Sequence, residues 1–460
     1  MALQRDRAVA VHLQLALAAI GLALTFGALS VLHYIPSLST RLESVGLGLP
    51  TLRPLHTTFA HTWIFAANLA FIYYFLAGRA RDGLDAADRR RFVFHTICWI
   101  VGGLGILISL MMGVTSGREY LGFHPVFSII FLAGWIAFAW TFFRYVAPGF
   151  WRRPVYVYMW TIGTLYFMYT FVEGHTYLLP LVNRFPIVDL QIQWKATGTI
   201  VGSFNFLVYG SLMYLGERLS GDESYGQSRT AFLLFGVGCL NSFTNFGHHT
   251  FHLPQTHVVK WIAFIVSMLE IIIVFRVLTD ILAMRGLKRE PGSYSATTAF
   301  LTAAKWWTLA MVFGGVIISI PSWNSIIHGT HVVVGHAMGA ELGIDSMVLF
   351  GVVTYLLMTR YPGDRSIRDR LDGRSMQSLI VAVNVAAATL VVWLMGSGVV
   401  NGLLRYHQRP VPEWLASGSW VFAAAGFALA LSLTMLLVRW APLLMGRSGL
   451  SDLHESVERV

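Results

Sequence analysis

Twelve apolar runs, each long enough to cross a lipid bilayer as a helix, constrain the fold of this chain more than any other feature of its sequence. A spanning helix needs roughly 20 mostly apolar residues, and in lipid every backbone polar group must be hydrogen-bonded within the protein. The runs lie at residues 10–36, 55–77, 92–113, 125–146, 155–180, 190–216, 229–250, 258–284, 298–320, 328–358, 376–402 and 417–441. We therefore expect an all-α, polytopic membrane protein built as a twelve-transmembrane-helix bundle.

The composition excludes an ordinary soluble domain. Of the 460 residues, 55% are hydrophobic and only 12% are charged, against about 25% charged residues in soluble proteins. The two cysteines, Cys98 and Cys239, lie within apolar runs and provide neither a disulfide framework nor a cysteine-rich metal site. Redox chemistry would therefore depend on the sixteen histidines. A single membrane domain is expected over 1–460, ending in a short polar tail at 447–460.

The net charge of +10 is a topology signal. Arginine-rich loops at 78–92, 216–229, 284–290 and 359–374 alternate with loops that carry few positive charges. Positively charged loops stay in the cytoplasm, which predicts that both termini are cytoplasmic. The excess of positive charge is thus explained by the membrane topology. The expected partner is the lipid bilayer, and no nucleic acid is expected.

Histidines and a few charged residues lie at membrane depth, where ionisable groups are costly and usually functional. The charged residues are Glu173, Lys195, Glu270, Lys305 and Glu341. The histidines fall at the outer ends of three predicted spans: His56 in span two, His248 and His249 in span seven, and His328, His331 and His336 in span ten. A single buried histidine often has only a structural role, but three sites at one depth indicate metal or heme ligands.

This pattern resembles the catalytic subunit I of the heme-copper oxidase superfamily, which includes terminal oxidases and nitric oxide reductases. The resemblance covers nearly the whole chain and implies two hemes, expected to be b-type, in a bacterial inner membrane. It identifies His336 as the ligand of the reactive high-spin heme, with His328 and His331 as further candidate cofactor-binding residues. It identifies His56 and Met338 as the pair of ligands of the low-spin heme. His336 and Met338 could each face a different heme, because residues two apart on a helix point about 200° apart. Met338 stands where the family has a second histidine, and the alternative is that it only fills the core.

The resemblance also implies a second, non-heme metal, iron or copper. His248 and His249 match two of its three family ligands, but the third, a histidine on span six, has no counterpart near 195–198. Candidates for a replacement are Glu270, His252, and the Glu173 and His175 region at the end of span five. Lys195 is the other possibility, as a fixed positive charge in place of the metal.

The function implied is reduction of nitric oxide, a small gaseous substrate, with electrons from cytochrome c or a c-type cytochrome subunit. Glu270 follows His248 at the spacing where nitric oxide reductases keep a glutamate, and no match to the span-six tyrosine of many oxidases is found. Glu270, Glu173 and Lys195 are the candidate catalytic residues, although Glu270 could instead pair with a lysine such as Lys260 or Lys305. The alternatives are an oxygen-reducing oxidase and, in another class, a non-catalytic heme gas sensor or electron-transfer subunit.

Overall fold

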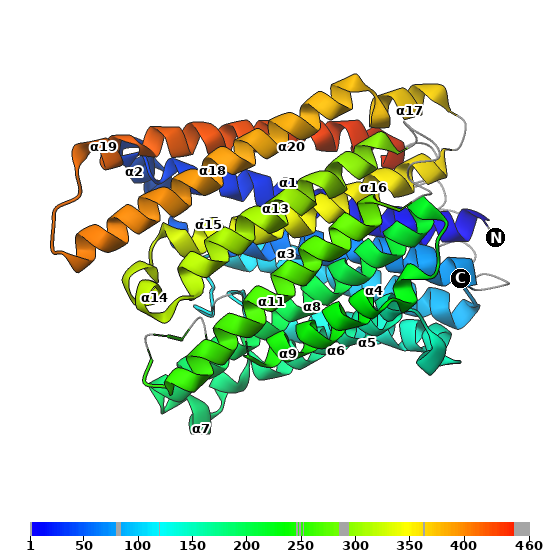
Figure 1. The fold of residues 1–460 in the computed structure, drawn as a ribbon, viewed down its shortest axis with the longest axis horizontal. Coiled ribbons are helices and arrows are strands. Elements are labelled where there is room, and N and C mark those ends of the chain that lie inside the picture. Colours follow the sequence, from blue (N-terminus) through cyan, green and yellow to red (C-terminus); the bar gives the residue numbers. More distant parts are fainter. Residues whose placement is uncertain are drawn as a thin grey trace.

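The computed structural model describes residues 2–79, 84–118, 120–244, 247, 250–251, 253–284, 294–361 and 364–445. These residues form helices and their connections, with no strand among them (Figure 1). The long helices are α1 (Ala2–Leu32), α3 (Leu49–Arg79), α4 (Ala86–Met111), α5 (Pro125–Val146), α6 (Val155–Glu173), α8 (Pro186–Ser220), α9 (Arg229–Thr244), α11 (His257–Leu282), α13 (Ser295–Ser319), α16 (Met347–Arg360), α18 (Arg374–Tyr406) and α20 (Ser419–Met445). Shorter helices are α2 (Pro36–Ser44), α7 (Pro180–Asn183), α14 (Pro321–Ile327), α15 (His331–Ala340), α17 (Arg365–Asp372) and α19 (Glu413–Ser417).

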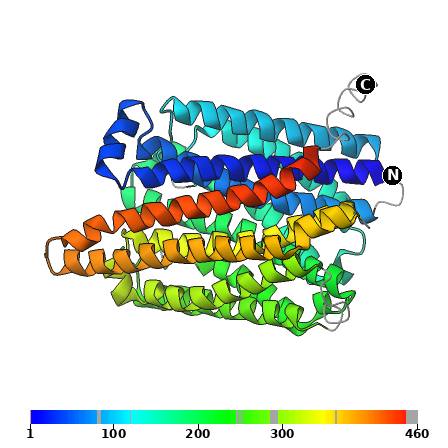
Figure 2. The same cartoon turned by 90° about the horizontal axis from the view of Figure 1, so that it is seen from above.

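The all-α polytopic architecture is confirmed. Eleven helices of the described part are long and apolar enough to cross a membrane, with α15 and α16 joined into one of them. The predicted seventh span corresponds to α9, which is described as far as Thr244. The helix α1 begins and α20 ends at the same end of the bundle (Figure 2), as an even number of crossings requires. The prediction that this end faces the cytoplasm concerns orientation and stays a prediction.

Local sequence sets the helix boundaries. The carboxylate of Asp85 accepts a hydrogen bond from the backbone N–H of Asp88 and so caps the start of α4. Pro125 and Pro186 occupy the first turns of α5 and α8, where a missing N–H costs nothing. Gly221 ends α8 in the left-handed region at φ 70°. Caps and prolines thus set where these helices begin and end.

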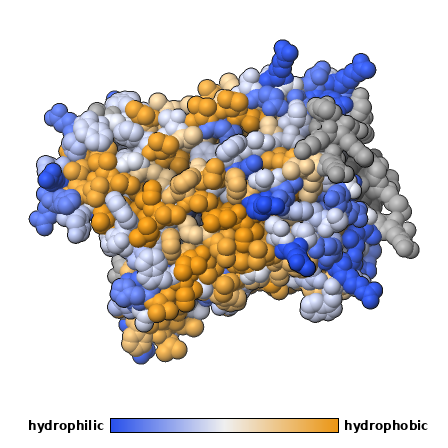
Figure 3. Space-filling view, viewed as in Figure 1, coloured by the Kyte–Doolittle hydropathy of each residue, from blue (hydrophilic) through white to orange (hydrophobic). Residues whose placement is uncertain are grey.

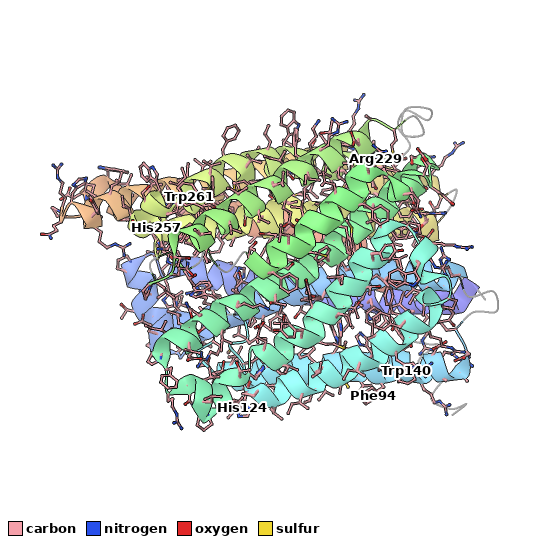
Figure 4. All side chains as sticks on the ribbon, turned by 60° about the horizontal axis from the view of Figure 1, so that its bottom comes forward. Phe94, His124, Trp140, Arg229, His257 and Trp261 are labelled. Atoms are coloured by element: carbon pink, nitrogen blue, oxygen red, sulfur yellow. The ribbon has the colours of Figure 1, made fainter. Side chains whose placement is uncertain are left out.

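On the face seen in Figure 3, apolar residues cover the middle of the bundle and hydrophilic residues gather towards its two ends. Phe94 of α4, Trp140 of α5 and Trp261 of α11 are exposed on the sides of the helices (Figure 4). His124 and His257 lie at one end of the molecule and Arg229 at the other (Figure 4). The helices α3, α8 and α16, in contrast, are largely buried and pack against one another. Polar side chains on these three helices therefore face protein rather than lipid.

Candidate heme and proton-transfer site

His336 lies in α15 with its ring against the glycines of α13. A Cβ atom at Gly314 would lie 4.0 Å from Nδ1 of His336, and one at Gly315 would lie 3.8 Å from Cε1. The sulfur-bearing side chains of Met268 and Met395 flank the same glycines. Nδ1 of His336 is buried and has no hydrogen-bond partner among the described residues. Because buried polar atoms nearly always have a partner, this imidazole in apolar surroundings fits the axial ligand of a heme.

His56 in α3 shows the complementary arrangement. Its Nδ1 lies 2.8 Å from the carbonyl oxygen of Ala23 in α1, so Nδ1 carries the hydrogen and Nε2 presents a lone pair. Metal-ligating histidines usually donate their second ring N–H to a carbonyl or carboxylate in this way. Gly27 of α1 makes the approach possible, since a Cβ there would lie only 2.7 Å from Nδ1 of His56. His56 therefore also fits an axial heme ligand.

The other predicted cofactor residues of span ten differ in their surroundings. Met338 is half-buried and packs against the core, about 200° around α15 from His336. At the start of the span, Nε2 of His331 lies 3.3 Å from the hydroxyl oxygen of Tyr34. His328, just before α15, meets the ring of Trp194 edge-on, with 6.1 Å between centroids. The structure thus places His331 and His328 nearer the start of the span than His336 and against protein partners.

Glu173 and Lys195 form an ion pair between α6 and α8. Nζ of Lys195 lies 3.1 Å from Oε1 and 3.3 Å from Oε2 of Glu173. The hydroxyls of Tyr169 and Thr199 donate to the same carboxylate, at 3.1 Å and 3.3 Å. Both oxygens of Glu173 are therefore engaged, and the positive charge of Lys195 is neutralised by this carboxylate.

His175 follows Glu173 at the end of α6, and both of its ring nitrogens have partners. Nδ1 lies 2.7 Å from the carbonyl oxygen of Phe171, and Nε2 lies 3.1 Å from Oγ of Ser128 in α5. Since Nδ1 must carry the hydrogen to bond a carbonyl, Nε2 accepts the hydroxyl hydrogen of Ser128. Metal binding by His175 would require this hydrogen bond to break.

The span-six positions where a third metal-binding histidine would be expected border a small pocket with a cavity volume of about 10 Å³. Ala196 and Thr197 of α8 line it together with Tyr120 and Leu121 of the connection between α4 and α5. Arg118, also in the lining, pairs with the carboxylate of Asp189 at 2.9 Å and 3.0 Å. These α8 side chains are small, and none offers a ring nitrogen.

The predicted metal ligands His248, His249 and His252 lie outside the described residues. The neighbouring Gly247 is described and packs against α11, where a Cβ would lie 2.8 Å from Cβ of Ala263. This contact places Gly247 at the level of Ala263 in α11.

Glu270 lies deeper than that level. It follows Ala263 by seven residues, which is about 10 Å along a helix. Its carboxylate lies next to the side chains of Asn241 of α9 and Tyr209 of α8, and its buried Oε2 has no hydrogen-bond partner among the described residues. The two lysines considered as ion-pair partners have other contacts: Lys260 donates to the carbonyl oxygen of Phe251, and Lys305 lies over the ring of Phe275. Glu270 is thus part of a buried polar contact between α8, α9 and α11.

The structure adds four polar residues to those identified from the sequence. Nε2 of His61 in α3 lies 3.3 Å from the carboxylate of Glu341, and the hydroxyl of Tyr120 lies 3.5 Å from the same carboxylate. Asp345 is buried one turn further along the span, and Tyr209 lies next to Glu270. Asp345 could have been found by counting every carboxylate within the predicted spans. His61 and the tyrosines carry no such signal.

Comparisons with known proteins agree with the arrangement. The family model "Cytochrome C and Quinol oxidase polypeptide I" matches residues 7–430. The cbb3-type cytochrome c oxidase subunit CcoN1 of Stutzerimonas stutzeri is 24% identical over 330 residues, covering 66% of each chain. The cytochrome c oxidase subunit 1 homolog of Agrobacterium tumefaciens (strain T37) is 23% identical over 363 residues, 75% of this chain and 65% of that one. The chain thus spans about two thirds of the length of these curated relatives.

A solved structure has the same fold. The structure of a heme-copper terminal oxidase dimer matches with a TM-score of 0.70 and 15% sequence identity, over 95% of this chain and 84% of that chain. The family match extends over nearly all of the residues that build the bundle, including both candidate heme ligands. The chain therefore belongs to the heme-copper oxidase subunit I family, whose members are heme-dependent oxidoreductases.

Proposed function

We propose that this chain is the catalytic subunit of a respiratory membrane enzyme that reduces nitric oxide. Two nitric oxide molecules, two electrons and two protons would give one nitrous oxide and one water. A cytochrome c or a c-type cytochrome subunit would supply the electrons, and the relationship to a cytochrome c oxidase subunit supports such a donor. The proposed location is a bacterial inner membrane.

The observation that carries this proposal is the absence of a span-six imidazole. The α8 side chains at 196–198 are alanine, threonine and glycine, and Lys195 is committed to Glu173. A copper site with three imidazole ligands cannot form from these residues together with His248 and His249. With two imidazoles the remaining ligands would have to be oxygen atoms, and a site of that kind suits iron better than cuprous copper. This supports nitric oxide over oxygen as the substrate.

The residues of this chain have distinct roles in the proposed reaction. His336 would hold one heme, His56 and Met338 the other, and His248 and His249 the non-heme metal. When bound, these groups supply electron storage and the position where the gas is reduced. The hydrogen bond from His56 to Ala23 fixes the orientation of its ring, and the methionines around His336 keep water away. Glu270 and Tyr209 provide a buried pair of protonatable side chains that can hold a proton.

Reduction of oxygen is the second candidate, and one pair of side chains favours it. Tyr209 lies on α8, the helix of the sixth span, next to the carboxylate of Glu270. A buried phenol can donate an electron and a proton together when an adjacent carboxylate accepts the proton. The two curated relatives carry names of oxidase subunits, which also supports this candidate.

Metal analysis with parallel turnover assays separates the candidates. The purified protein would be assayed for heme, iron and copper, and for consumption of nitric oxide and of oxygen with reduced cytochrome c. Two hemes, a non-heme iron and nitric oxide turnover are expected. Copper with oxygen turnover would establish the second candidate instead. Two hemes without a third metal or any turnover would identify a gas sensor or electron-transfer subunit, and a protein without heme would contradict both heme sites.

A further inference from the structure

Four buried side chains on α1, α3 and α4 carry polar atoms without hydrogen-bond partners. They are His12 of α1, Tyr73 of α3, and His95 and Trp99 of α4. Nε2 of each histidine, the hydroxyl of Tyr73 and Nε1 of Trp99 are closed off from solvent and unpartnered within the described part of the chain. Buried polar atoms nearly always have a partner. Four such atoms on neighbouring helices therefore point to a bound ligand.

The rings of these four residues pack against one another. The centroids of His12 and His95 are 5.4 Å apart, and the two ring planes are inclined by 24°. The ring of Tyr73 lies 4.8 Å from that of His12, and the ring of Trp99 lies 5.4 Å from that of His95. Both histidines are 0% exposed. The unpartnered atoms thus belong to one aromatic cluster in the interior of the protein.

The hydrogen bonds of the two histidines decide which ring nitrogen carries the hydrogen. Nδ1 of His12 lies 3.0 Å from the carbonyl oxygen of Ala8, and Nδ1 of His95 lies 2.9 Å from that of Gly134 in α5. A carbonyl oxygen only accepts, so Nδ1 carries the hydrogen in both rings and each Nε2 presents a lone pair. Metal-ligating histidines usually donate their second ring N–H in this way.

The spacing of the two rings allows one ion to contact both. A metal–nitrogen bond of about 2 Å places an ion about 3 Å from the centre of an imidazole ring, so two rings can share an ion when their centroids are up to about 6 Å apart. The 5.4 Å between the centroids of His12 and His95 lies within this limit. One ion can therefore accept a lone pair from α1 and another from α4.

The surroundings of the pair favour a cation of single charge. Among the residues that the structure describes, no third histidine, cysteine or carboxylate completes a three-ligand site. Asp88, the buried carboxylate of α4, is held by Arg91 and Arg144. A divalent ion without an anionic ligand would be costly in this interior. The cuprous ion carries one charge, binds two ligands readily, and is well matched to imidazole.

We propose that His12 and His95 bind one cuprous ion that links α1 to α4. The site is separate from the candidate heme sites, because Gly27, which contacts His56, follows His12 by fifteen residues, or about 22 Å along the helix. Binding forms two nitrogen–copper bonds and transfers no electron. It displaces no proton either, since both Nε2 atoms already lack hydrogen.

The test measures binding of Cu(I) to the purified protein. The protein is loaded with Cu(I) without oxygen, titrated with the cuprous chelator bicinchoninate, and analysed for copper per chain. His12→Gln and His95→Gln should each lose one equivalent of copper or bind it about 100-fold more weakly, the upper range for losing a group that only orients a ligand. The double variant should lose no more than this one equivalent. The matched control is His33→Gln, because both ring nitrogens of His33 already have partners, and its copper content should equal that of wild type.

A further variant distinguishes this copper from copper bound at His248 and His249. His248→Ala/His249→Ala should keep one equivalent of Cu(I) with two nitrogen ligands in its X-ray absorption spectrum, and this comparison remains available if neither His12→Gln nor His95→Gln assembles. Cu(I) should also raise the melting temperature of wild type but not of His12→Gln. Equal copper content in wild type, His12→Gln and His95→Gln would overturn the site. So would a His248→Ala/His249→Ala protein that holds no copper, and bound water alone would then satisfy the two lone pairs.

Discussion

The contact between Gly27 and His56 gives a sharp test of the low-spin heme site. A methyl group at position 27 would lie 2.7 Å from Nδ1 and 2.8 Å from Cε1 of His56, whereas carbon atoms pack comfortably at about 3.5 Å or more. The ring must therefore shift by about 0.8 Å or turn. Either movement lengthens the 2.8 Å hydrogen bond to Ala23 beyond the usual limit near 3.2 Å. Gly27→Ala thus removes the contact that orients the ring of His56.

The magnitude follows from the role of such contacts. Loss of the group that orients a metal-ligating histidine typically lowers metal affinity 10- to 100-fold, which is about 1.4 to 2.8 kcal/mol. We therefore expect Gly27→Ala to reduce the low-spin heme content, or to shift its midpoint potential, while the high-spin heme at His336 is retained.

The matched control is Gly21→Ala on the same helix. Nothing lies within 4 Å of a Cβ atom at Gly21, so this variant changes only helix propensity, by up to about 1 kcal/mol in the stabilising direction. Heme content is measured as the pyridine hemochrome, and the two hemes are distinguished by their visible spectra and by redox titration. Equal low-spin heme content and midpoint potential in Gly27→Ala and Gly21→Ala would contradict this prediction. His56 would then not be a heme ligand that is oriented by its hydrogen bond to Ala23.

Three further predictions concern other parts of the molecule. Met338→His should keep the low-spin heme and lower its midpoint potential in a redox titration, because a thioether ligand raises the potential; an unchanged potential would exclude Met338 as a ligand. Lys195→Met should lower the melting temperature more than the double variant Lys195→Met/Glu173→Gln, because the single change leaves a buried carboxylate without its cation; equal melting temperatures would contradict this. The backbone N–H of Asp88 and the guanidinium of Arg144 lower the pKa of Asp85 from 3.8 to about 2, so its stabilisation is present above pH 3.8 and is lost as the pH falls to 2. Between pH 5 and pH 2 the melting temperature of Asp85→Ala should therefore fall less than that of wild type. An identical fall in both proteins would contradict a stabilising role of the Asp85 carboxylate.

The sequence by itself determined the architecture. The apolar runs predict the helices because in a bilayer a long apolar segment must form a helix, whatever its neighbours are. This local rule explains why the all-α polytopic fold was confirmed and why eleven of the twelve expected spans meet the length and hydropathy of a membrane helix in the described residues. The family resemblance also rested on positions along the chain, such as His56 and His336, which can be read without knowledge of contacts.

Only the tertiary structure decided which polar groups meet. Glu173, considered as a metal ligand, pairs with Lys195, and Glu270 lies next to Tyr209 and Asn241 rather than a lysine. His61 and Glu341, separated by 280 residues, form a contact that no sequence pattern indicated. The direction of a side chain around its helix, and the helix that it then faces, depend on how all the helices pack. Hydropathy specifies how deep a residue lies in the membrane, but the partner at that depth is chosen by packing.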